Sequence, residues 1–556
     1  MSEIKASDLF VQCLEAEGVT HIFGVPGEEN ADFMISLKKS DSIEFVLCRH
    51  EQAAAFMADL YGRLTGKAGV CLGTLGPGAT NLVTGVADAN MDRAPLVALI
   101  GQAGTYRLHK ESHQNMDAIA MFRPITKWAQ TIYNAGTVPE VIRKAFKTAE
   151  AEKPGAVVIE LPEDIAKHMV EGVPLIPKKT RRPAADHKAI KAAVDVIAGA
   201  KNPVILAGNG CVRKRASEQL RVLAKKTGMP VVNTFMGKGA VSMDDEHCLF
   251  TMGLQGRDHV NLLIDSADVI IAAGYDLVEY APGFWNHGTD KKVVVIDFEP
   301  AEVDAALPVE VDIVADVADS LWSINQELDN RYGAKLPLFD IKKHAKLRQT
   351  IIEDLTAEAE DNSFPMKPQR VVNEMRRALG PKDIMLSDVG AHKMWVSRYY
   401  NCYEPNTCQI SNGFCTMGFA LPGAIGSKVA LPDQKVGCIM GDAGFLMNVQ
   451  DLETAARLKI PFVGVIFCDE EYGLIKWKQQ NQFDGEHSDL KFTNPDFELL
   501  AKSFGCWGKT VRKGEELRPI IEEAFKQNVP ALVAVPVDYS ENLKLTKRLG
   551  AIEATI

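Results

Sequence analysis

The chain of 556 residues is too long for a single hydrophobic core and indicates about three domains. Hydrophobic residues make up 46% and charged residues 24%, as in ordinary globular proteins, and the net charge of −11 argues against nucleic acids and membranes as partners. No apolar run approaches the roughly 18 residues that span a bilayer, the chain does not start like a secretion signal, and no C-x-x-C pair is present. These features predict a cytoplasmic protein with reduced thiols.

The first part of the chain alternates short apolar segments with helical patterns. A helical pattern over residues 5–17 is followed by five expected strands, at 21–25, 44–49, 69–73, 96–100 and 156–160. Such alternation is typical of a doubly wound parallel sheet. We expect a first domain over residues 1–170, and a linker rich in proline and basic residues after it.

Two further α/β domains are expected, over residues 188–332 and 366–556, with a charged helical connector between them. Their expected strands are 203–207, 230–233, 269–273 and 293–297 in the central domain, and 384–387, 435–440, 462–467 and 531–536 in the third. The central domain has no G-x-G-x-x-G with a downstream acid, so its dinucleotide signal is weak. The predicted fold is therefore α/β, with three doubly wound parallel-sheet domains.

The segment 435–478 organises the third domain. Its two apolar runs are joined by a helical pattern, and a strand, a helix and a second strand form a βαβ unit with parallel strands. Asp442 and Asp469 then follow the carboxyl ends of the two strands, where open α/β sheets bind ligands.

These two acids predict a cation and phosphate site. Neighbouring carboxylates repel unless a cation lies between them, and oxygen ligands suit Mg²⁺. The N–H groups of Ala443 and Gly444 at the start of a helix suit a phosphate. From the residues alone the alternative stays open that Asp442 caps its helix and Asp469 lies in a turn.

Other single residues are ambiguous in the same way. Glu51 follows an expected strand and is either an exposed acid in the first turn of a helix or an acid held in an apolar cleft. The sequence 76–78 (GPG) is typical of a plain turn, and Gln114 of a polar surface loop. Met417 is typical of core filling.

Together, these features form a recognisable order. A strand that ends in Glu51 is followed by GPGATN, by His-Gln, by Asp-Val-Gly-Ala-His, by Thr-Met-Gly, and by Gly-Asp with a second acid 27 residues later. This order resembles the thiamine diphosphate-dependent 2-keto acid enzymes, and within them the acetolactate synthases. Residues 274–280 and 536–542 are similar to the catabolic branch, which does not use FAD, so FAD is not expected.

The resemblance implies roles at the pyrimidine end of thiamine diphosphate. Glu51 matches the glutamate that shifts the aminopyrimidine to its imino form, which then takes the C2 proton. Met417 matches the apolar residue that bends the cofactor, and the carbonyl of Cys415 matches the acceptor for the amino group. Gln114 matches a donor to the reacting carbonyl.

The resemblance also implies roles at the diphosphate end of the cofactor. The metal ligands would be Asp442, Asp469 and the backbone carbonyl of Glu471, with Mg²⁺ as the metal. The remaining contacts to the cofactor would come from Gly390, His392, Ala443, Gly444, Tyr472 and Gly473.

Substrate contacts are implied at Gly27, Glu28, Gln114 and Lys478. Glu28 stands where the family has a small residue, and Lys478 where related carboligases have tryptophan or glutamine, so either residue could change the substrate. The expected reaction joins two pyruvates into 2-acetolactate with loss of CO₂. The alternatives are a 2-keto acid decarboxylase, a carboligase with another donor or acceptor, and a non-catalytic subunit. The family implies a homodimer or homotetramer with active sites at the subunit interface.

Overall fold

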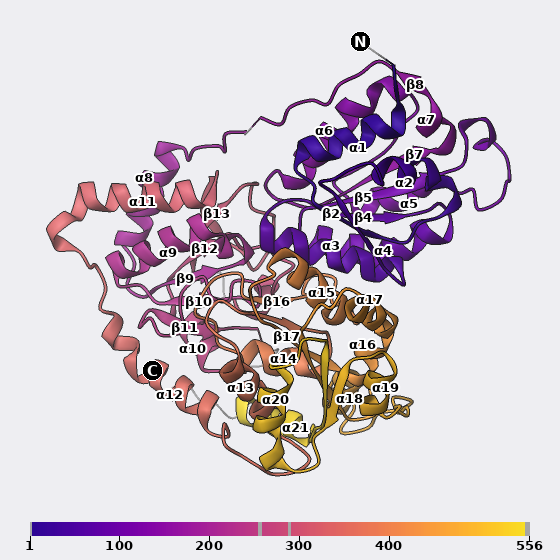
Figure 1. Cartoon of the computed structure of the whole chain (residues 1–556). Coiled ribbons are helices and arrows are strands. Elements are labelled where there is room, and N and C mark those ends of the chain that lie inside the picture. Colours follow the sequence, from indigo (N-terminus) through magenta and orange to yellow (C-terminus); the bar gives the residue numbers. More distant parts are fainter. Residues whose placement is uncertain (1–2, 179, 254–257, 287–290, 551–556) are drawn as a thin grey trace.

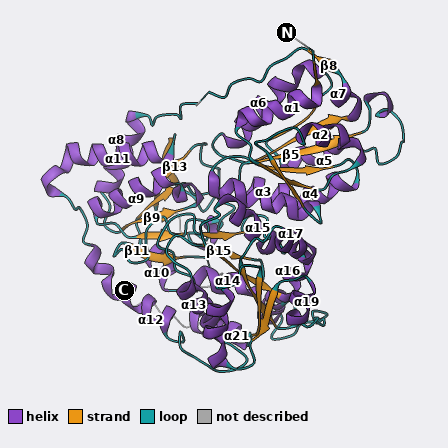
Figure 2. Ribbon diagram, viewed as in Figure 1, coloured by secondary structure: helices purple, strands orange, loops and turns teal. Residues whose placement is uncertain are grey.

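The computed structural model describes residues 3–178, 180–253, 258–286 and 291–550, so the last six residues of the third predicted domain lie outside the described part (Figure 1). It contains three six-stranded sheets in which every pair of neighbouring strands is parallel. Figure 2 shows the strands in three groups, each flanked by helices. The predicted fold class is confirmed. Each sheet lies inside one predicted domain range, whose boundaries stay predictions.

The N-terminal sheet has the strand order β3-β2-β4-β5-β7-β6. Its strands are β2 (His21–Gly24), β3 (Glu44–Leu47), β4 (Gly69–Gly73), β5 (Leu96–Gln102), β6 (Trp128–Thr131) and β7 (Ala156–Pro162). Its helices are α1 (Ala6–Glu17), α2 (Ala31–Leu37), α3 (Glu51–Thr65), α4 (Pro77–Met91), α5 (Ala118–Phe122), α6 (Val138–Glu150) and α7 (Glu163–Lys167). A short antiparallel pair, β1 (Ile4–Lys5) with β8 (Met169–Val170), joins the two ends of this domain.

The C-terminal sheet has the order β16-β15-β17-β18-β20-β19, which is the order of the N-terminal sheet when the strands are counted along the chain. Its strands are β15 (Ile384–Ser387), β16 (Cys408–Ile410), β17 (Val436–Gly441), β18 (Val463–Cys468), β19 (Trp507–Thr510) and β20 (Ala531–Pro536). Its helices are α13 (Pro368–Ala378), α14 (Ala391–Tyr399), α15 (Ala420–Ala430), α16 (Asp442–Met447), α17 (Leu452–Arg457), α18 (Gly473–Gln482), α19 (Phe497–Ser503), α20 (Leu517–Ala524) and α21 (Ser540–Gly550).

The central sheet has a different order, β11-β10-β9-β12-β13-β14, which is the order of dinucleotide-binding folds. Its strands are β9 (Pro203–Ala207), β10 (Val231–Asn233), β11 (Cys248–Thr251), β12 (Val269–Ala273), β13 (Lys292–Asp297) and β14 (Val309–Val314). Its helices are α8 (His187–Ala198), α9 (Lys214–Thr227), α10 (His259–Ser266) and α11 (Val317–Tyr332), and α12 (Ala345–Thr356) forms the connector to the third domain.

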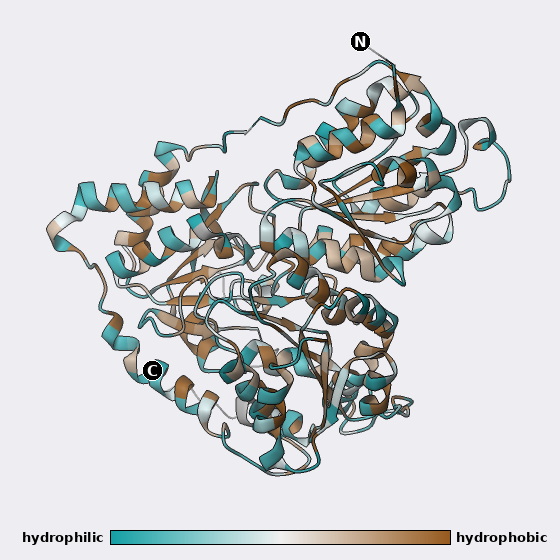
Figure 3. Cartoon of the chain, viewed as in Figure 1, coloured by the Kyte–Doolittle hydropathy of each residue, from teal (hydrophilic) through white to brown (hydrophobic). Residues whose placement is uncertain are grey.

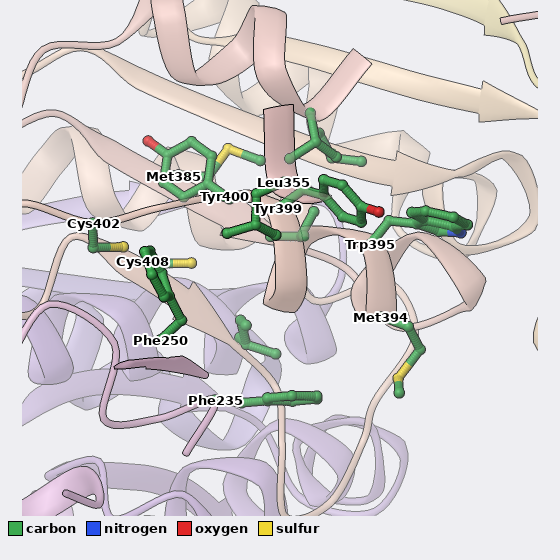
Figure 4. Packing of buried hydrophobic residues seen from close by; sticks show 14 of the residues in the cluster. Phe235, Phe250, Leu355, Met385, Met394, Trp395, Tyr399, Tyr400, Cys402 and Cys408 are labelled. Carbon is green, nitrogen blue, oxygen red and sulfur yellow. The ribbon is translucent and has the colours of Figure 1, made fainter. Parts of the chain in front are cut away.

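The domains share their hydrophobic cores (Figure 3). One cluster joins the N-terminal and C-terminal sheets through α3, α4 and α15, and another joins the central and C-terminal sheets through α14. Figure 4 shows part of the second cluster, to which the central domain contributes Phe235 and Phe250, and α14 contributes Trp395 and Tyr399. Closely packed cores are rigid, so a core that two domains share fixes the position of one domain relative to the other.

Helices α3 and α15 approach most closely at Gly426. A Cβ atom at Gly426 would lie 2.3 Å from the carbonyl oxygen of Met57 on α3. We therefore expect Gly426→Ala to push the two helices apart, to cost about 1–3 kcal/mol of stability, and to lower the melting temperature. Differential scanning calorimetry measures this, with Gly283→Ala as the matched control, because no atom lies within 4 Å of a Cβ there. Equal melting temperatures of the two variants would contradict the close packing.

Candidate active site

A cavity of about 610 Å³ lies between the central and C-terminal domains, at the carboxyl ends of β15, β17 and β18. It is the natural ligand site of such a sheet. The predicted cofactor and metal residues, and one predicted substrate residue, come together in its wall: Gly390, His392, Cys415, Met417, Asp442, Ala443, Gly444, Asp469, Glu471, Tyr472, Gly473 and Lys478.

Asp442 is fully buried at the end of β17 and fixes the loops around it. Its Oδ2 accepts hydrogen bonds from the backbone N–H groups of Asp469 (3.1 Å) and Glu470 (2.9 Å) and from Nδ2 of Asn494 (2.7 Å). Its Oδ1 accepts from the N–H of Ala443 at 2.8 Å. The N–H of Ala443 thus has a partner within the chain, and its contact with a phosphate stays a prediction.

Asp469 lies at the end of the adjacent strand, β18. Burial and the charge of Asp442 raise the pKa of the Asp469 carboxyl to about 8. A cation between the two carboxylates would relieve the repulsion between them. The side chain of Glu471 pairs with Lys476 and Lys491, and its carbonyl already accepts from the N–H of Gly473 at 2.9 Å.

A cation at this position would have few protein ligands. Among the described residues, no group of three His, Cys, Asp or Glu side chains is placed to hold a metal. A Mg²⁺ between Asp442 and Asp469 would therefore complete its shell with carbonyl, phosphate or water oxygens, as this ion commonly does.

His392 forms another part of the cavity wall. Its ring is buried, burial lowers its pKa to about 3, and its Nε2 has no hydrogen-bond partner within the described part of the chain. The ring covers Gly390 and Gly441, where a Cβ atom would lie 2.7 and 3.1 Å from Cε1. A neutral imidazole with a free nitrogen, next to two carboxylates, fits an oxygen-rich ligand such as a diphosphate bound with its cation.

The loop that carries Cys415 and Met417 has an unusual backbone, with φ of +55° at Cys415 and +82° at Gly418. The carboxylate of Asp388 accepts from the N–H of Gly418 at 3.0 Å, and Nδ2 of Asn448 donates to the Gly418 carbonyl at 2.8 Å. Met417 is only partly buried and lines the cavity, so it does not fill a core. The surrounding structure thus holds a strained loop against the cavity.

The N-terminal domain supports the same loop through buried acids that the sequence analysis missed. Asp88 accepts from Oγ of Ser411 (2.5 Å) and Oγ1 of Thr416 (3.1 Å), and Asp92 accepts from the N–H of Asn412 at 2.8 Å. Arg63 of α3 bridges both acids and neutralises part of their charge. These residues belong to no local sequence motif, and their partners lie far away along the chain.

The remaining predicted residues form a second group at the carboxyl ends of the N-terminal strands. Glu51 is 8% exposed, so the reading as an exposed acid is wrong, and its Oε2 accepts from Nδ2 of Asn81 at 2.9 Å. Gln114 has φ of +56° and lies against Gly76.

This second group does not reach the cavity of its own chain. Gly27 packs on Thr74, and Glu28 is exposed. No described residue of the N-terminal domain lines the cavity. One chain therefore holds the predicted site as two separate halves.

Lys478, a predicted substrate residue on α18, is exposed and lines the cavity. Its ammonium has no hydrogen-bond or ion-pair partner among the described residues, so it is free to meet a ligand. This side chain is therefore both exposed to solvent and part of the cavity wall.

Family models of thiamine pyrophosphate enzymes, named for the compound also called thiamine diphosphate, match the chain in three places. The N-terminal TPP binding domain matches residues 4–121, the central domain residues 190–324, and the C-terminal TPP binding domain residues 388–535. The chain belongs to the thiamine pyrophosphate enzyme family. The resemblance seen in the sequence is thereby confirmed.

Similar proteins of this family match over nearly their whole length. The chain is 36% identical to the acetolactate synthase of Bacillus subtilis, over 99% of this chain and 97% of that protein. It is also 36% identical to the catabolic acetolactate synthase of Raoultella terrigena, over 98% and 97% of the two chains. The probable acetolactate synthase large subunit of Methanococcus aeolicus is 35% identical, over 99% and 96%. Within the described residues, no helix is long and apolar enough to cross a membrane.

The buried carboxyl of Asp388 should make the stability of the folded protein depend on pH. Burial raises the pKa of this carboxyl to about 7, so between pH 4 and 7 the folded state holds a proton that the unfolded state has lost, and stability falls as the pH rises. Asp388→Asn keeps one acceptor and does not titrate. We expect the variant to melt below the wild type at pH 5, and the gap to narrow by pH 8, in thermal scans followed by circular dichroism. A constant or widening gap would contradict this.

Proposed function

We propose that this protein condenses two molecules of pyruvate to 2-acetolactate and CO₂, with thiamine diphosphate and Mg²⁺ as cofactors. The observation that carries the proposal is the likeness to acetolactate synthases along almost the entire chain. The retention of Glu51, Met417, Asp442 and Asp469 at positions that suit the cofactor supports catalysis over a non-catalytic subunit. The cytoplasmic location stays a prediction from the sequence.

In this proposal the cofactor spans two domains. The third domain (residues 366–556) holds the diphosphate with His392, Gly444 and a Mg²⁺ on Asp442 and Asp469. The first domain (residues 1–170) binds the pyrimidine, and the central domain (188–332) closes the cavity. The cofactor, once bound, supplies the electron sink for loss of CO₂ and the nucleophilic carbon for the new bond.

Glu51 handles the proton. Its carboxylate lies at the start of α3, is shielded from water, and keeps one oxygen beyond the 2.9 Å contact with Asn81 for a second partner. Such a carboxyl is suited to hydrogen-bond a ring nitrogen and to exchange a proton with it. Gln114, exposed on the same edge, is placed to donate to a developing alkoxide.

The separation of the two halves supports a homodimer or homotetramer. Glu51 and Gln114 belong to one half and the cavity to the other, so a second copy of the chain would supply the missing half. Large apolar side chains at the cavity are exposed and available for burial by that copy, including Phe284 (56%) and Tyr472 (40%). A twofold arrangement would give two equal sites.

FAD is not part of the proposal, although the central sheet has the dinucleotide-binding order. The carboxylate of Glu279 accepts from the N–H groups of Asn209 (3.0 Å) and Asp276 (2.9 Å), at the turn where such folds bind a pyrophosphate. Lys153 of the N-terminal domain, in turn, pairs with Asp276 and Asp297 at 2.7 Å. These contacts give the groups at this turn partners within the chain itself, which supports the prediction that FAD is not used.

A second candidate is a decarboxylase, or a carboligase with another acceptor, and the free ammonium of Lys478 in the cavity favours it. Turnover of pyruvate with and without thiamine diphosphate and Mg²⁺ tests both. The proposal expects acetolactate, detected as acetoin after acid treatment, and only with both cofactors. Free acetaldehyde as the main product would favour the second candidate, and no turnover would contradict the proposal.

Glu51→Gln tests the proton-handling role. The variant keeps the shape and the hydrogen bond to Asn81 but cannot transfer a proton, so we expect kcat to fall about 10²–10⁴-fold with little change in thiamine diphosphate affinity. Steady-state kinetics and calorimetric titration measure the two quantities. Glu44→Gln, an exposed acid of the same domain, is the matched control. Full activity of Glu51→Gln would remove Glu51 from the reaction.

A further inference from the structure

A buried lysine lies in the wall of the cavity next to His392. Lys393 is the third residue of α14 and only 5% exposed, and it lines the cavity. The resemblance stated for the sequence gives this position no role. An ammonium in a protein interior needs its three N–H donors satisfied and its charge balanced.

The partners of Lys393 are all neutral. Its Nζ donates to the carbonyl of Ser411 at 3.0 Å and to Sγ of Cys415 at 3.2 Å, and it lies 5.8 Å from the centre of the Phe235 ring. Two of its three donors are thus used. Among the residues that the structure describes, no carboxylate forms an ion pair with it, so the cavity offers the remaining donor and the whole charge to a ligand.

Other buried or partly buried cations differ from Lys393 in their partners or in their position. Arg398 pairs with Asp258 at 2.9 Å, and Lys153 pairs with Asp276 and Asp297. Lys238 has neutral partners like those of Lys393, Oγ1 of Thr251 and the carbonyl of Ser397, but it does not line the cavity. Lys393 therefore combines a charge without a counter-ion and access to a ligand.

The anion that Lys393 meets is not the diphosphate. Successive residues of an α-helix point about 100° apart, so Lys393 and His392 face different directions. His392 covers Gly441 on the side of Asp442, whereas Lys393 contacts the loop of Ser411 and Cys415, where the resemblance places the aminopyrimidine. The ammonium is thus at the reacting end of the cavity, and the free anion there is a substrate carboxylate.

The chemistry selects one of the two substrates. The donor pyruvate loses its carboxylate as CO₂, and the carbon that carried it bonds to the carbonyl carbon of the acceptor, whose oxygen takes up one proton. An ion pair to the donor carboxylate would stabilise the ground state and oppose the loss of CO₂. The carboxylate of the acceptor passes unchanged into the product, so an ion pair to it stabilises the complex without that penalty.

We propose that Lys393 binds the carboxylate of the acceptor 2-keto acid and so favours a keto acid over an aldehyde as the acceptor, and over protonation, which releases acetaldehyde. The inference rests on the proposed function, because it assigns a specificity residue to that reaction. It also explains how a cavity with several acids can favour an anionic acceptor.

Lys393→Met, which keeps the length of the side chain and removes the charge, tests the proposal in the full-length enzyme. A lost charged hydrogen bond predicts about a 10- to 100-fold higher pyruvate concentration for half-maximal acetolactate formation. The ratio of acetolactate to acetaldehyde should fall by a similar factor. Affinity for thiamine diphosphate, and acetoin formation with added acetaldehyde as neutral acceptor, should stay close to wild type. Lys393→Gln, which retains a polar donor, replaces it if Lys393→Met does not fold.

Lys238→Met is the matched control, because it removes a buried ammonium outside the cavity and should leave the product ratio unchanged. An unchanged product ratio in Lys393→Met would overturn the proposal, and weakened thiamine diphosphate binding would then assign Lys393 to support of the cofactor loop. If the wild type makes no acetolactate, the proposed function fails. Calorimetric titration with pyruvate then still tests whether Lys393 binds a carboxylate. Equal pyruvate affinities of the wild type and Lys393→Met would refute that role.

Discussion

The carboxylate of Asp442 is the contact on which the rest of the site depends. It sits at the tip of β17 and accepts hydrogen bonds from the turn that follows β18 and from Asn494. These bonds fix Asp469 beside it, and burial and the charge of Asp442 raise the pKa of the Asp469 carboxyl. The result is a buried acid next to a partly buried one, a pair that favours a cation, in the wall of the cavity.

A second constraint is the repeated sheet order. The N-terminal and C-terminal sheets have the same strand order, so each presents ligand loops at the carboxyl ends of equivalent strands. Yet α3 and α15 pack these two domains so that Glu51 does not reach the cavity of its own chain. Meanwhile Asp88 and Asp92 hold the loop that does line it. In the function proposed above, a second copy of the chain completes each site.

The sequence predicted the inner strands well and the outer strands poorly. Of the strands in the three large sheets it missed β6, β11, β14, β16 and β19, each of which is an edge strand with a single neighbouring strand. Inner strands of a parallel sheet are buried on both faces and form continuous apolar runs, whereas an edge strand such as β14 alternates with polar residues. The role of Asp88 was not predicted for a different reason, because its partner Ser411 is 323 residues away along the chain. Asp388, Asn494 and Lys393 likewise depend on contacts that no local pattern encodes.

Hybrid dimers test the central claim, that two copies share each active site, most directly. Chains with Glu51→Gln and chains with Asp442→Ala carry different tags, are co-expressed, and the doubly tagged hybrids are purified. One site of a hybrid dimer then has both substitutions and the other has none, so about half of the wild-type acetolactate activity should return, although each parent is inactive. Hybrids as inactive as their parents would contradict the account.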